Sequence, residues 1–225
     1  MTEEDEISKS RGYRIDRVLA LSDGVFAFAV TLLVLDLIVP TLSPGASSMD
    51  LWQGLSNEYL NFFNYILSFF IAGIWWNSHH RNFEQIRDSN TALRMLNLFF
   101  LIWIALLPFF TKILDQYHGL QLSVVLYAID QAAAGIFLAL IWLYASRNNR
   151  LINKNMSKTA IRFFTLRNVI TPIFFIISIG ISFIDANVAS YSWYGLIPLF
   201  IIVLRLEQRS EKHQTKPNNT TILKK

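Results

Sequence analysis

The chain has 225 residues, of which 53% are hydrophobic, and its 18 phenylalanines fall largely within long apolar blocks. Such a composition is too apolar for an ordinary soluble domain and is typical of an integral membrane protein. No cysteine is present, which excludes disulfides, thiolate metal sites and cysteine nucleophiles. The net charge of +4 does not by itself indicate a binding partner, and the positions of the charged residues are needed to interpret it.

The N-terminal segment is polar and is followed at once by a long apolar stretch. Its first residues, MTEEDEISKS, are acidic and lack the basic-then-apolar pattern of a cleaved signal peptide. Residues 1–14 are predicted to form a cytoplasmic N-terminal arm. Between residues 18 and 39 the only charged side chains are Asp23 and Asp36. Because about 20 helical residues cross a bilayer core, this stretch is predicted to be the first transmembrane helix.

Five further apolar segments follow, at residues 51–78, 95–114, 120–144, 163–184 and 191–206. The connection between the first two is rich in Ser, Pro and Gly, as a loop should be. From residue 207 the chain is polar and is predicted to be a disordered cytoplasmic tail. The predicted fold is all-α: a polytopic membrane protein with six transmembrane helices per subunit in a domain of residues 15–206, and no soluble domain.

The positions of the basic residues predict the topology. Six spans place both termini on one side, and Lys and Arg mark the cytoplasmic side. Of the 20 Lys and Arg residues, only Lys112 falls in a loop on the other side, which leaves 19 for the side that holds the termini. Both termini are therefore predicted to be cytoplasmic. A five-span alternative, with the last segment lying in the interface, would place the basic tail outside and is disfavoured.

The first helix carries a stripe of large apolar residues. At about 100° per residue one narrow face, with Thr31 at its edge, holds Leu21, Gly24, Phe28, Leu32 and Leu35. From periodicity alone, lipid contact or ordinary helix packing is the simplest interpretation of this stripe.

A short polar face on the same helix requires partners. Ser22 and Asp23 would be costly in lipid unless neighbouring helices satisfy them. The second apolar segment ends in WWNSHH, which places Trp76 and His79 at a similar depth, and Arg17 precedes the pair by about a turn and a half. The simplest interpretation of these five residues is a structural network that sets the rotation of the first helix.

Metal binding and enzyme chemistry have little support. Adjacent histidines, His79 and His80, point about 100° apart on a helix, and no HxxxH or HExxH spacing accompanies them. No GxSxG motif, phosphate-binding glycine loop or pair of carboxylates on one helix is present. The protein is therefore predicted not to be an enzyme and to require neither a metal nor a cofactor.

Two further acids lie within apolar segments. Asp36 either draws cations into an outer vestibule or faces the lipid headgroups. Asp130, beside Gln131, is an intramembrane acid and so a candidate functional residue. Pairing of Asp130 with a neighbour such as Asn64 or Asn97 is the favoured expectation.

The chain resembles the prokaryotic branch of the transmembrane protein 175 family. Residues 17–40, RVLALSDGVFAFAVTLLVLDLIVP, are similar to the RxxxFSD signature of the family and the apolar run that follows it. The similarity continues in the Trp76-x-x-His79 pattern and in LFFLIWIALLPFFT at residues 98–111. The resemblance implies a potassium-selective cation channel in the prokaryotic cell membrane, assembled as a homotetramer, with K⁺ as the permeant ion.

The resemblance also implies roles for individual residues. The four first helices would line the pore, with Phe28, Leu32 and Leu35 as constricting layers and Thr31 as a pore-lining residue for selectivity. The structural network of the family maps onto Arg17, Ser22, Asp23, Trp76 and His79. Two departures are that Leu21 replaces the signature Phe and that Phe28 stands where Ile or Leu is usual.

Other classes of function stay open. A proton-coupled secondary transporter would use intramembrane groups such as Asp23, Asp130 or His79. Against it, the sequence lacks internal repeats and a pair of Gly/Pro-broken helices. A structural membrane protein or a membrane enzyme has no positive feature beyond scattered intramembrane polar residues.

Overall fold

The computed structural model describes residues 3–153 and 155–198, with side chains from Ile15 onward. Its five long helices are α1 (Glu3–Leu33), α3 (Tyr59–Gln85), α4 (Thr91–Gln116), α5 (Gln121–Ser146) and α6 (Lys158–Ser182). Two short helices are α2 (Ser48–Asn57) and α7 (Ala186–Ser192), and single 3₁₀ turns are η1 (Val34–Asp36), η2 (Arg147–Asn149) and η3 (Trp193–Gly195). The predicted tail, residues 207–225, and the last part of the predicted sixth span lie outside the described residues.

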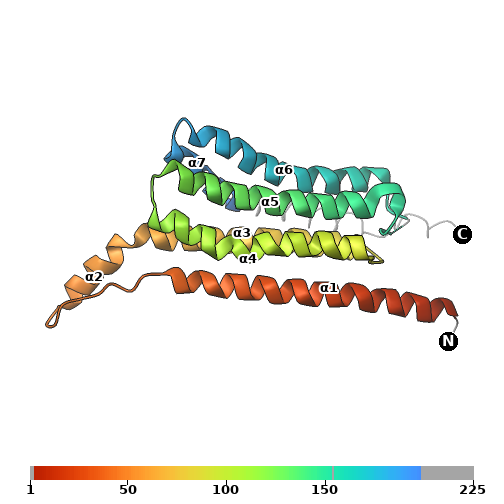
Figure 1. Ribbon diagram of the computed structural model, residues 1–225, viewed down its shortest axis with the longest axis horizontal. Helices are drawn as coiled ribbons and strands as arrows, with labels where there is room; N and C mark the ends of the chain where they lie inside the picture. The colour runs from red at the N-terminus through yellow and green to blue at the C-terminus, as the bar shows by residue number, and fades with distance from the viewer. Residues whose placement is uncertain (1–2, 154, 199–225) are drawn as a thin grey trace, which may run out of the picture.

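The long helices lie side by side as a layered bundle (Figure 1). α1 lies at one edge and packs against α3 and α4. α5 lies between α4 and α6, and α7 packs against α6 and α5. Within the part of the chain that the structure describes, the helices that pack against α1 lie on one side of its axis.

Four helical segments are long and apolar enough to cross a membrane: residues Ile15–Asp36, Thr91–Gln116, Gln121–Asn149 and Lys158–Ser182. α3 is equally long, with 27 residues, but asparagines and histidines along it lower its mean hydropathy. The prediction of an all-α membrane protein is therefore confirmed in its class, whereas the count of six spans stays a prediction.

The N-terminal half of the bundle differs from the sequence-based expectation in two places. α1 begins at Glu3, so the segment predicted as an arm continues the helix. The segment predicted as one helix at residues 51–78 is divided at Glu58 into α2 and α3. α2 starts at a capping box in which Ser47 N donates to Asp50 Oδ2 at 2.7 Å and Asp50 N donates to Ser47 Oγ at 3.3 Å. The hydrogen bonds that Ser47 N and then Ser47 Oγ donate to the Asp50 carboxylate hold the pKa of Asp50 below its ordinary value.

Basic segments of the chain come together at one end of the bundle. The start of α1, the α3–α4 connection and the α5–α6 connection all lie at the end marked N (Figure 1). An antiparallel bridge between Ile86 and Ile152 ties the two connections together. Arg87 N donates to Leu151 O at 2.7 Å within this bridge. Charges that are distant in the sequence thereby share one face, as the predicted topology requires.

Three helices approach one another closely at Gly135 of α5. A Cβ atom there would stand 2.8 Å from Pro172 Cβ on α6 and 2.9 Å from Trp75 Cη2 on α3. Trp75 and Pro172 are themselves buried, so neither can move aside easily. Glycine therefore allows three helices to approach one another at this point.

Gly135→Ala is accordingly expected to lower the stability of the subunit by about 1–3 kcal/mol, the usual cost of overpacking a close-packed core. The melting temperature of the purified protein in detergent measures the effect. Gly180→Ala on α6 is the matched control, because among the described residues no atom outside its own stretch of helix lies within 4 Å of the added Cβ. Equal melting temperatures for the two variants would show that the α5–α6 contact is not as tight as described.

Candidate functional site

α1 has two distinct faces along its apolar length. One face is buried against the rest of the subunit and consists of Ile15, Val18, Ser22, Phe26, Ala29 and Leu33. Their three- and four-residue spacing is that of a single helix face. The contacts of this face are with α3 and α4, which together fix the position of α1.

The opposite face of α1 carries the predicted stripe and points away from the subunit. The side chain of Phe28 is 65% exposed and that of Leu35 is 74% exposed. Thr31 is exposed and Leu32 lies half-buried at the border. Leu35 belongs to the 3₁₀ turn η1 rather than to α1 itself. The structure thus places all four candidate pore residues outside the core of their own subunit.

The hydroxyl of Thr31 is oriented by its own helix. Thr31 Oγ1 donates to the backbone oxygen of Phe28 at 2.8 Å. A hydroxyl that donates to the backbone keeps its lone pairs free to accept a hydrogen bond or to coordinate a cation. The polar atom on the exposed face of α1 is therefore an oxygen acceptor.

A buried chain of hydrogen bonds anchors the other face of α1. Ser22 Oγ donates to Val18 O at 2.8 Å and accepts from Asn97 Nδ2 of α4 at 3.0 Å. Asn97 Oδ1 lies 2.7 Å from His79 Nε2 of α3. Because an amide oxygen only accepts, His79 carries its hydrogen on Nε2 in this arrangement. One asparagine thus connects three helices.

Aromatic rings enclose His79 on several sides. Its ring stacks on Phe100 at 5.3 Å between centroids with an interplanar angle of 6°, and it lies 4.5 Å from Phe83. Phe26 of α1 lies 6.2 Å away at a tilt of 58°. His79 is 1% exposed, so its place in the site is structural packing plus one hydrogen bond to Asn97. Among the described residues no group of three or more His, Cys, Asp or Glu could hold a metal ion.

A second, exposed contact links α1 to α3. Trp76 Nε1 donates to Asp23 Oδ1 at 2.9 Å. The Trp76 ring stacks on His80 at 5.6 Å, and His80 Nε2 lies 3.8 Å from Glu84 Oε1. The predicted network is thus divided between two contacts: Asp23 with Trp76 at the surface, and Ser22 with His79 through Asn97 inside.

Asn97 is the residue of this network that sequence analysis placed elsewhere. Either Asn64 or Asn97 was expected as the partner of Asp130, and this expectation is wrong. Asn64 Nδ2 donates to Asp115 Oδ1 at 2.8 Å. Asn97 forms its hydrogen bonds with Ser22 and His79 instead. The sequence feature that could have indicated this role is the position of Asn97 as an isolated polar residue within the apolar run MLNLFF.

The two acids of the apolar segments, Asp36 and Asp130, also have defined surroundings. Asp130 is fully buried, and its Oδ2 accepts from Gln131 Nε2 at 2.8 Å, while Gln131 Oε1 accepts from Trp75 at 2.7 Å. Asp36, at the opposite end of α1 from the basic segments, pairs with Lys112 Nζ of α4 at 3.1 Å. Asp36 therefore acts as an ionic tie between η1 and α4, and Lys112 is a partner that the sequence did not predict.

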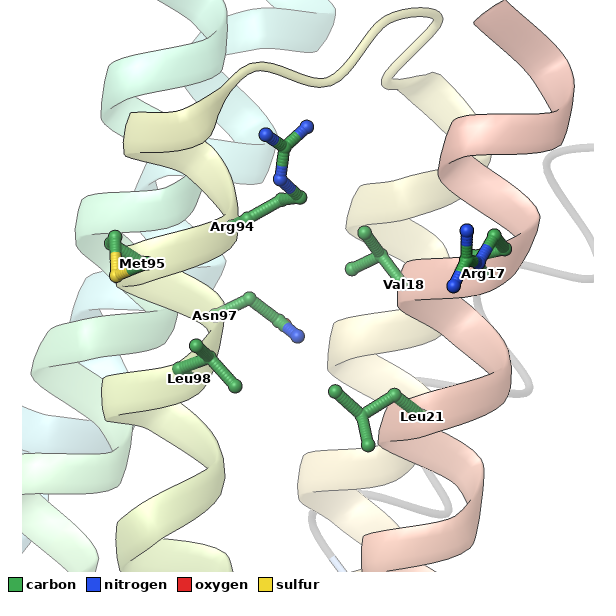
Figure 2. Close-up of a pocket in the computed structure, with 7 residues that line it drawn as sticks. All are labelled: Arg17, Val18, Leu21, Arg94, Met95, Asn97 and Leu98. Atoms are coloured by element: carbon green, nitrogen blue, oxygen red, sulfur yellow. The ribbon is translucent and has the colours of Figure 1, made fainter. Parts of the chain in front are cut away.

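A groove of about 520 Å³ lies between α1 and α4 near the basic end of the bundle. Figure 2 shows Val18 and Leu21 of α1 facing Asn97 and Leu98 of α4 across it. The groove is lined by two arginines and by mainly apolar side chains: Arg17, Val18, Leu21, Arg94, Met95, Asn97 and Leu98. Arg17 of the predicted network lies at this groove, at the basic end of α1.

Comparison with known proteins gives consistent matches. Residues 17–108 match the family described as the endosomal/lysosomal potassium channel TMEM175. A Streptomyces collinus protein named a potassium channel is 30% identical over 189 residues, which cover 82% of this chain and 89% of that protein. A Chryseobacterium protein of the same description is 30% identical over 200 residues, which cover 87% of this chain and 97% of that protein.

A solved structure shares the fold. The crystal structure of a lysosomal potassium-selective channel TMEM175 homologue from Chamaesiphon minutus gives a TM-score of 0.74 at 24% identity. The match covers 84% of this chain and 97% of that chain. The bundle and its apolar helices define a polytopic helical membrane protein with the fold of that structure. The chain belongs to the TMEM175 family, so the resemblance to the transmembrane protein 175 family is confirmed.

Proposed function

We propose that the protein is a potassium-selective cation channel, a homotetramer whose pore is lined by the α1 helices. The observation that carries this proposal is the exposure of Phe28 and Leu35 on a helix whose other face is buried in its own subunit. Such an outward stripe of large residues is free to meet its copies around a symmetry axis. Family membership and the names of the relatives support potassium as the permeant ion.

Phe28, Leu32 and Leu35 form constricting layers one helical turn apart in the proposed pore. A narrow apolar tube holds water poorly, so an ion that cannot keep its hydration shell is stopped there. The layers therefore act as a hydrophobic gate and filter. Thr31, between the layers, offers an oxygen acceptor to a partly dehydrated K⁺. The ring faces of Phe28 attract a cation as well.

The buried anchor sets which residues face the axis. Ser22, Asn97 and His79 hold the buried side of α1 against α4 and α3. A rotation of α1 by one residue position, about 100°, would remove Phe28 from the axis. The anchor thereby stabilises the closed arrangement, and opening dilates or rotates the α1 helices against it.

The remaining assignments follow from this proposal. Residues 15–206 form the channel domain, the helical extension of α1 within residues 1–14 forms a cytoplasmic N-terminal arm, and residues 207–225 form a cytoplasmic tail. The protein resides in a prokaryotic cell membrane, spans the bilayer several times with both termini in the cytoplasm, and passes monovalent cations, with K⁺ preferred. It requires neither a metal cofactor nor nucleic acid.

Reconstitution in liposomes with a potassium gradient tests the proposal. A passive potassium flux that exceeds the sodium flux, with currents that reverse near the potassium equilibrium potential, is the expected result. Flux that depends on a proton gradient would instead favour a proton-coupled transporter that uses Asp23, Asp130 or His79. Liposomes that contain the Phe28→Ala variant serve as the positive control for a channel that is closed under the chosen conditions.

A further inference from the structure

We propose that the groove between α1 and α4 receives the neighbouring subunit, whose Asp16 pairs there with Arg94. This inference rests on the proposed tetramer and names the contact that closes it. The partner is a second copy of this chain, and the contact lies at the basic end of the bundle.

The two flanks of α1 differ in charge. At about 100° per residue, Asp16 and Asp23 lie roughly 100–120° to one side of the buried face centred near Ser22. Leu21 lies roughly 100° to the other side, where the groove begins. Asp16 and Asp23 are both exposed. One flank of α1 therefore carries carboxylates and the other flank borders an arginine-lined groove.

Cyclic symmetry brings unlike flanks together. In a closed ring each subunit presents one surface to the neighbour on one side and a different surface to the neighbour on the other side. With α1 nearest the axis, the acidic flank of one subunit faces the groove flank of the next. Symmetry also keeps equivalent residues at equal depth, so Asp16 of one subunit stands level with Arg17 of its neighbour.

The groove suits such an occupant. Its lining combines two arginines, Arg17 and Arg94, with the apolar residues Leu21, Met95 and Leu98, which are 51%, 49% and 41% exposed in the subunit. Packed helices lie about 8–10 Å apart, which places a flank residue of one within reach of the other. Arg94 Nη2 now donates to the neutral Thr91 hydroxyl at 3.1 Å. A carboxylate would form a stronger, charge-assisted hydrogen bond with the same guanidinium.

Cross-linking in this naturally cysteine-free chain tests the contact directly. The protein with both Asp16→Cys and Met95→Cys, treated with a short bis-maleimide, is expected to give linked products up to four subunits in denaturing gels. Each single variant has one cysteine per subunit, so the cross-linker can link its subunits only in pairs. The matched control combines Asp16→Cys with Ile173→Cys, because Ile173 is exposed on α6 at the far edge of the bundle.

Charge reversal provides a second test that needs no cysteine. Arg94→Glu and Asp16→Arg are each expected to reduce the tetramer fraction by about twofold or more in native mass spectrometry, since like charges then face each other across the interface. The double variant restores the pairing with the charges exchanged and is expected to recover the tetramer. Arg162→Glu, on an exposed position of α6, should leave the fraction unchanged.

The outcomes separate this inference from the proposed function. A tetramer that conducts potassium but gives no four-subunit product, with no effect of charge reversal, overturns the Asp16–Arg94 contact and leaves the channel standing. A wild-type protein that is not tetrameric overturns the proposed assembly itself. Retention of anionic lipid that is lost in Arg94→Glu, while the tetramer persists, would assign the groove to lipid and contradict the proposal.

Discussion

Replacement of Phe28 by Ala is expected to raise the single-channel potassium conductance about tenfold, which corresponds to a barrier lower by about 1.4 kcal/mol. The four phenyl rings define the most restrictive apolar layer of the proposed pore, and their removal widens and wets it. Because the side chain is 65% exposed in the subunit, its truncation leaves the core intact. Planar bilayer recording of the purified protein measures the change.

The control for this prediction is Ile177→Ala. Ile177 is 56% exposed on α6, so the same kind of truncation is made on a face that the proposal assigns to lipid. Its conductance should equal that of the wild type. If Phe28→Ala and Ile177→Ala both conduct like the wild type, Phe28 does not lie in the ion pathway.

Asn97→Ala is expected to destabilise the protein by about 2–4 kcal/mol, because it leaves two buried polar partners unsatisfied. Ser22 Oγ loses a donor at 3.0 Å and His79 Nε2 loses an acceptor at 2.7 Å. The loss also frees α1 to rotate against α3 and α4, so potassium flux should rise or become irregular in the fraction that stays folded. Thermal unfolding in detergent and liposome flux measure the two effects.

Asn77→Ala is the corresponding control for Asn97. Asn77 is half-buried in the last third of α3, and its side chain accepts one hydrogen bond from Arg81 Nε at 3.2 Å. Asn77→Ala should lower the stability by well under half of the loss expected for Asn97→Ala, since water can replace a partly exposed hydrogen-bond partner. Equal losses at the two positions would show that Asn97 is not a special link between helices.

The orientation of α1 shows how much of the structure the local sequence pattern can predict. Residues three and four apart share a helix face, so spacing alone separated the stripe of Phe28, Leu32 and Leu35 from the side that carries Ser22. The structure buries Ser22 and exposes Phe28 and Leu35, in agreement with that division. Hydropathy located α1, α4, α5 and α6 in the same way, because a span requires a continuous apolar run.

The local sequence pattern did not predict features that depend on a break in the backbone or on a partner distant in the chain. The division of the second apolar segment at Glu58 depends on how α2 departs from the bundle, and its hydropathy does not mark the break. The partners of Asp130, Asn64 and Asn97 were assigned wrongly, since every amide in an apolar segment is a plausible partner for an acid until the helices are packed.

The sequence by itself determined that this is a helical membrane protein of the TMEM175 family, and which face of α1 carries the large apolar stripe. Only the tertiary structure decided what holds that stripe in place. Ser22 and Asn97 are 75 residues apart and Trp76 and Asp23 are 53 apart, so their contacts exist only through the packing of α1 on α3 and α4. Periodicity is a local property that the chain carries everywhere, whereas a hydrogen bond between helices depends on their relative depth and rotation, which arise only when the whole bundle is assembled.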